Sequence, residues 1–83
     1  MKKISSKISS LKRDRFEKVA SNRVQKIIDY MGLLGNCSNK NNYEYSEKDV
    51  ELMFKEIYRA LKEAKTRYDK ELKKMVKEGF KFE

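Results

Sequence analysis

Apolar residues recur at steps of three and four positions along two long segments of the chain, a spacing that gathers them on one face of an α-helix. In the first segment this apolar stripe consists of Phe16, Ala20, Val24, Ile27, Met31 and Leu34. No proline interrupts the segment, so the pattern predicts a helix over about residues 11–34. Gly35 stands just past the expected end, where a glycine in the left-handed conformation often closes a helix.

The second segment begins with a capping pattern. Ser46 is the expected N-cap, and Asp49, three residues later, approximates a capping box. Tyr45 and Val50 flank this start as a hydrophobic staple. The apolar stripe that follows consists of Val50, Met53, Phe54, Ile57, Tyr58, Leu61, Ala64, Tyr68, Leu72, Met75 and Val76. It predicts a helix over about residues 46–78 that ends at Gly79.

The N-terminal segment repeats Lys-Ile-Ser-Ser. Serine hydroxyls compete for backbone hydrogen bonds and so weaken a helix. We therefore expect residues 1–10 to form a flexible basic Lys/Ser arm, with Ser9 or Ser10 capping the helix that follows. A frayed extension without a role explains the repeat equally well. The remaining residues, 11–83, then form a single helical domain with a loop at 35–45.

Two amphipathic helices joined by about eleven residues predict an all-α fold, an antiparallel helical hairpin. The second helix is the longer one, and its apolar stripe continues past the point that the first helix can cover. A second copy of the chain would bury this overhang, so we expect a homodimer that forms a helical bundle. The expected dimer interface consists of Tyr68, Leu72 and Met75.

The side-chain inventory excludes most site chemistry. The 83-residue chain contains no histidine and one cysteine, Cys37, so a zinc ligand set and an internal disulfide are both excluded. Cys37 follows the negative end of the first helix, which favours a buried structural cysteine over a nucleophile. A calcium loop starting at Asn36 would place Lys40 among its ligands and lacks the required glycine. We expect a non-enzymatic protein with no catalytic residue, no metal and no cofactor.

The hydropathy of the chain predicts a cytoplasmic protein without a membrane partner. No apolar run approaches the ~18 residues of a membrane span. The first residues are basic but lack the apolar core of a secretory signal. A reducing compartment also suits a chain with a single cysteine.

Charge is the strongest functional signal. The formal net charge is +8, and residues 1–26 alone contain nine basic and two acidic residues. Such a surplus favours binding to a polyanion, with DNA as the expected partner, only slightly over a solvated face. The candidate nucleic-acid-binding residues are Lys12, Arg13, Arg15, Lys18, Arg23 and Lys26.

The segment between the helices is rich in asparagine and tyrosine. Asparagines form Asx-turns and cap helices, and tyrosines anchor loops by packing, so a structural role is favoured over recognition. The alternative is a partner-binding loop made of Asn36, Asn39, Tyr43 and Tyr45.

The sequence Leu-Gly-Asn-Cys-Ser-Asn at 34–39, followed by Tyr-Glu-Tyr-Ser at 43–46, resembles a signature of small basic helical proteins from Gram-positive bacteria and their mobile elements. The resemblance covers about residues 15–68. It implies a bacterial, cytoplasmic setting on a plasmid or phage, and it carries no known activity.

Two functions remain in competition at this point. The first is a nucleic-acid-binding accessory protein of a mobile genetic element, which contacts mainly phosphates with weak sequence specificity. The alternative is a protein-interaction module or small inhibitor that docks onto a host or element-encoded partner through the Asn/Tyr loop.

Overall fold

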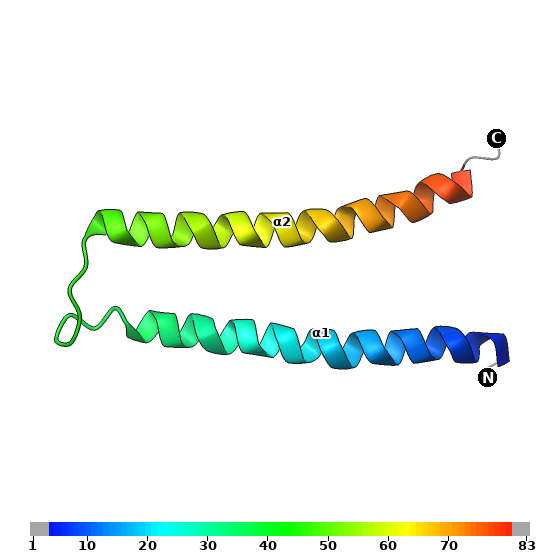
Figure 1. Cartoon of the computed structure of the whole chain (residues 1–83), viewed down its shortest axis with the longest axis horizontal. Helices are drawn as coiled ribbons and strands as arrows, with labels where there is room; N and C mark the ends of the chain where they lie inside the picture. The colour runs from blue at the N-terminus through cyan, green and yellow to red at the C-terminus, as the bar shows by residue number, and fades with distance from the viewer. Residues whose placement is uncertain (1–3, 81–83) are drawn as a thin grey trace. The chain divides into compact units, whose positions relative to one another are not determined.

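The computed structural model describes residues 4–80 and, within them, the side chains of residues 10–74. The described chain consists of two α-helices, α1 (Ile4–Asn36) and α2 (Glu47–Phe80), joined by a loop (Figure 1). No strand occurs in these residues. The predicted all-α class is therefore confirmed.

Helix α1 begins seven residues before the expected start at Leu11. It contains 33 residues and α2 contains 34, so the expectation that the second helix is much the longer one is wrong. Ser9 and Ser10 lie inside the helix, so the prediction that one of them caps it is wrong. Extending an existing helix adds one hydrogen bond per residue, and a serine costs only a fraction of a kcal/mol in the helix interior. The flexibility of residues 1–10 stays a prediction, and its first three residues lie outside the described part.

The end of α1 does not use a left-handed glycine. Gly35 is helical, and no described glycine has a positive φ. Instead, the helix ends in three short turns. In these turns the backbone N–H groups of Cys37, Ser38 and Asn39 donate to the carbonyl oxygens of residues 34, 35 and 36, at 3.0, 3.1 and 3.3 Å respectively. These turns satisfy the last helical carbonyls by tightening the chain, which removes the need for the expected glycine cap.

The start of α2 confirms the predicted capping box. The Ser46 backbone N–H donates to Asp49 Oδ2 at 2.8 Å, and the Asp49 N–H donates to Ser46 Oγ at 3.1 Å. Tyr45 and Val50 are half-buried, as residues of a hydrophobic staple should be. The helix continues through Gly79 to Phe80, so the expected end is wrong. A single glycine costs about 1 kcal/mol and does not by itself stop a helix.

The chain divides into two compact units, one ending at Tyr43 and the other beginning at Glu44. Within residues 10–74 no side chain is fully buried, so neither unit contains a hydrophobic core of its own. The expected hairpin packing is therefore not supported by the structure, and the dimer stays a prediction. Both depend on contacts that a helix cannot make within itself.

Candidate nucleic-acid interface

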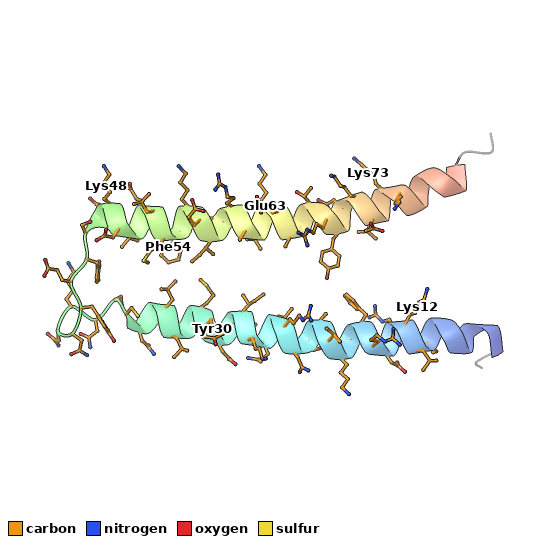
Figure 2. All side chains as sticks on the ribbon, viewed as in Figure 1. Lys12, Tyr30, Lys48, Phe54, Glu63 and Lys73 are labelled. Carbon is orange, nitrogen blue, oxygen red and sulfur yellow. The ribbon has the colours of Figure 1, made fainter. Side chains whose placement is uncertain are left out.

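One face of α1 gathers most of the predicted phosphate-binding side chains. We call it the basic stripe, and its residues, at steps of three and four, are Lys12, Arg15, Val19, Arg23, Lys26 and Tyr30. Figure 2 shows Lys12 and Tyr30, the two ends of this stripe, on α1. This spacing keeps the six side chains on one side of the helix, because three or four residues make about one turn.

The basic stripe runs beside the apolar stripe of the same helix. Arg15 directly precedes Phe16, Arg23 precedes Val24, and Lys26 precedes Ile27. Consecutive helical residues point about 100° apart. A partner that covers the apolar stripe therefore leaves the basic stripe accessible.

The six predicted phosphate-binding residues are all exposed, but they are not equivalent. Arg13 Nε lies 2.9 Å from Glu17 Oε2, and its guanidinium carbon lies 5.6 Å from the centre of the Phe16 ring. Within the described residues the other five have no acidic partner; they are Lys12, Arg15, Lys18, Arg23 and Lys26. The structure thus divides the predicted site into five cations without a counter-charge and one that is already paired.

Few acids accompany the basic stripe. Asp14 and Glu17 lie on other faces of α1, as their spacing from the stripe requires. Asp29 accepts a hydrogen bond from Gln25 Nε2 at 3.0 Å, so its carboxylate contacts a glutamine one turn earlier rather than a cation of the basic stripe. The stripe itself contains no acidic residue. Its positive charge is therefore not balanced within the stripe.

Tyr30 is a candidate that sequence reasoning missed. Its side chain is 68% exposed, the highest value among the large apolar residues whose side chains are described. It lies four residues after Lys26 and seven after Arg23, which extends the basic stripe by one turn. The sequence contains this spacing, but the helix was predicted from its apolar stripe, and Tyr30 does not belong to that stripe.

The loop residues serve the structure in the way that the sequence favoured. The Asn39 carbonyl accepts the N–H groups of Asn42 and Tyr43 at 3.1 and 3.0 Å, and its Oδ1 accepts that of Asn41 at 2.9 Å. This is an Asx-turn, which confirms the structural interpretation of Asn39. Of the four predicted partner-binding residues, Asn36, Asn39 and Tyr43 take part in loop hydrogen bonds through their backbone.

The two loop tyrosines differ in exposure. Tyr45 is half-buried, whereas Tyr43 is 53% exposed. Tyr43 is therefore the larger apolar surface that the loop offers to a partner.

The remaining predicted positions are exposed or lie outside the described side chains. Tyr68 and Leu72 are 55% and 61% exposed, and the side chain of Met75 is not among those described. Cys37 is exposed, so the expectation that it is buried is wrong. It lies in the turns that end α1, where its backbone N–H donates to the Leu34 carbonyl.

The described residues contain neither a cluster of metal-binding side chains nor a membrane-spanning helix. No group of three histidine, cysteine, aspartate or glutamate side chains comes together there as a metal site would require. Neither helix contains, within the same residues, an apolar stretch long enough to cross a membrane.

Comparison of the chain with protein-family models, with curated proteins and with solved structures found no match. The resemblance carried by residues 34–39 and 43–46 therefore stays a prediction. The function of the chain is therefore inferred from its own side chains.

Proposed function

We propose that this chain is a non-enzymatic nucleic-acid-binding accessory protein that holds phosphates on the basic stripe of α1. The observation that carries the proposal is one face of α1 that brings together four exposed cations, Lys12, Arg15, Arg23 and Lys26. They have no acidic partner in the described part of the chain, and no acidic residue lies among them. Cations that are not neutralised internally attract a polyanion and release its counterions on binding. The proposed setting is the cytoplasm of a bacterium that carries a plasmid or phage, with DNA as the expected partner.

Sequence specificity should be weak. Asparagine and glutamine read adenine edges well, but Gln25 already donates to Asp29 and the basic stripe contains neither residue type. Lysine acts on phosphate mainly as a point charge. Contacts of this kind position a protein on nucleic acid without selecting a sequence.

We also propose that the apolar stripes are covered by packing into a helical hairpin and a homodimer. Leu61, Tyr68 and Leu72 on α2 are 55–61% exposed, and burying a large aliphatic side chain contributes roughly 1.5–3 kcal/mol. A two-fold partner would cover both copies of this surface at once, with Met75 extending it. The dimer would also double the number of basic stripes available to one nucleic acid.

A matched pair of double variants tests the proposed interface. Lys12→Gln with Lys26→Gln removes two cations from the basic stripe, and Lys55→Gln with Lys62→Gln removes two exposed, unpaired lysines from α2. Fluorescence anisotropy with a labelled oligonucleotide measures both. We expect the first variant to weaken binding about tenfold or more at low salt and the second to weaken it less than about threefold. Equal losses would mean that net charge, rather than this face of α1, determines binding.

One observation favours the second candidate function, a protein-interaction module. Tyr43 is 53% exposed on a loop that the Asn39 hydrogen bonds hold in shape. An ordered loop with an exposed aromatic residue is a common anchor for a protein partner. Replacing Tyr43 with alanine would abolish such a contact and leave oligonucleotide binding unchanged. Loss of oligonucleotide binding in this variant would argue against a separate role for the loop.

A further inference from the structure

Tyr30 differs from the other residues of the basic stripe because it is the one that exposes an aromatic ring. Its side chain is 68% exposed. Among the described residues its side chain has no hydrogen-bond or ring partner, whereas Tyr45 is half-buried. An unpartnered ring at the end of a row of cations is a surface that fits a flat, apolar group attached to an anion.

The spacing of Tyr30 from its neighbouring cations suits a nucleotide. With a rise of 1.5 Å per residue, Tyr30 lies ~6 Å beyond Lys26 along the helix axis and ~10 Å beyond Arg23. Successive phosphates of a stacked strand rise about 3.4 Å. A base on Tyr30 and phosphates on Lys26 and Arg23 would thus lie within about three nucleotides of one another on one strand.

We propose that Tyr30 stacks on an unpaired base, so that the preferred ligand is single-stranded nucleic acid. The inference rests on the proposed function, because it assigns a ligand class to the same face of α1. In a duplex the faces of the bases are hidden in the stack, and an aromatic side chain on a helix surface meets only the backbone. In a single strand each base offers a face, and stacking does not depend on its identity. Weak sequence specificity is the consequence of both contacts.

The test compares two ligands and three variants. The ligands are a labelled oligo-dT of about 20 nucleotides and a duplex of the same length, long enough for a site of several nucleotides. The variants are Tyr30→Leu, Tyr30→Phe and the control Tyr58→Leu. The control removes a ring that is 66% exposed on α2 and keeps an apolar side chain in the apolar stripe of that helix. Circular dichroism establishes that each variant keeps the helical content of the wild type.

The proposal predicts that the wild type binds oligo-dT more tightly than the duplex. Tyr30→Leu should weaken oligo-dT binding by about 5- to 100-fold, the range for loss of one base–aromatic stack, and duplex binding by less than about twofold. Tyr30→Phe keeps the ring and should stay within about twofold of the wild type, as should Tyr58→Leu.

A second readout reports the contact directly. The chain contains no tryptophan, so Tyr30→Trp introduces a single tryptophan at the proposed stacking position, and its fluorescence can be excited separately from that of the tyrosines. We expect oligo-dT to quench its fluorescence and the duplex to leave it unchanged.

The two ways of failing are distinguishable. If Tyr30→Leu binds oligo-dT like the wild type while binding still falls with salt, the stacking proposal is overturned and phosphate binding by α1 stands. If the wild type binds neither ligand in a salt-dependent way, both proposals are overturned.

Discussion

Helices α1 and α2 have almost the same length but distribute their charges differently. Helix α1 contains seven basic and three acidic residues, and α2 contains ten basic and eight acidic ones. Within the described side chains α2 forms three ion pairs, Arg59 with Glu56, Lys65 with Asp69 and Lys74 with Glu71. Helix α1 forms one, between Arg13 and Glu17. Three of the nine basic side chains described on α2 thus have an acidic partner, against one of six on α1, and α1 has the larger net positive charge.

The apolar residues show the opposite contrast. They segregate from polar residues much more sharply around α2 than around α1. On α1 the apolar pattern is diluted by exposed residues on other faces, such as Tyr30 and Leu33. This contrast is the reason why we propose packing for α2 and nucleic-acid binding for α1.

The largest expected effect breaks the packing assigned to α2. Leu72→Asp places a charge in the apolar stripe, where burial without a partner costs several kcal/mol. In sedimentation at low micromolar concentration, the wild type should give about twice the 9.9 kDa chain mass, and the variant should give the chain mass.

Leu52→Asp is the matched control for that experiment. Leu52 is 56% exposed, close to the 61% of Leu72, but its position lies off the apolar stripe of α2. It should leave the dimer intact. A folded wild-type monomer, or equal effects of the two variants, would remove the basis for a dimer through this stripe.

The next effect separates two arginines that are two residues apart on α1. Arg15 has no acidic partner, whereas Arg13 is paired with Glu17 and lies over Phe16. Arg15→Gln should weaken oligonucleotide binding about threefold to tenfold at low salt, and Arg13→Gln should change it less than about twofold. Anisotropy titrations of the two variants measure this. The reverse order would show that the Arg13 ion pair opens to bind phosphate.

A smaller effect concerns how the helices begin. Ser46→Ala removes the hydroxyl that accepts the Asp49 N–H, and loss of such a cap costs about 1 kcal/mol. Ser21→Ala is the control on α1, where the Ser21 hydroxyl donates to the Glu17 carbonyl inside the helix and alanine is the better helix former. Thermal unfolding followed by circular dichroism should show a lower melting temperature for the first variant only. Equal melting temperatures would mean that α2 does not depend on its cap.

The smallest effect tests the sign of a glycine substitution at the end of α1. Gly35 is helical, without a positive φ, and a Cβ there would meet nothing within 4 Å. Gly35→Ala should therefore stabilise the protein by about 0.4–1 kcal/mol in denaturant unfolding. A destabilisation of similar size would indicate a left-handed glycine, as the sequence alone suggested.

Features that depend on residues a few positions apart were predictable from the sequence. Features that depend on a choice between alternative hydrogen bonds, or on contacts between distant segments, were not. The cap at Ser46 and Asp49 was predicted because its donors and acceptors lie three residues apart. The cap at Gly35 was wrong because short turns satisfied the same carbonyls by another route. The hairpin and the dimer could not be settled because they depend on how separate apolar stripes meet, which no local rule determines.

The candidate site followed the same division. The six predicted cations are all exposed, as charge and helical spacing favour, and their role in binding stays a prediction. The pairing of Arg13 with Glu17 was not anticipated, although the two lie four residues apart. Tyr30 was missed because its importance depends on its place beside Lys26 rather than on the apolar pattern.

The most direct test of the central claim is the salt dependence of wild-type binding to nucleic acid. The four cations of the basic stripe have no acidic partner among the described residues. They predict that the logarithm of the binding constant falls with the logarithm of salt concentration at a slope of about −3.6 for a duplex and about −2.8 for a single strand. Anisotropy titrations between low and moderate salt measure both slopes. A slope close to zero for both ligands would contradict phosphate binding by α1.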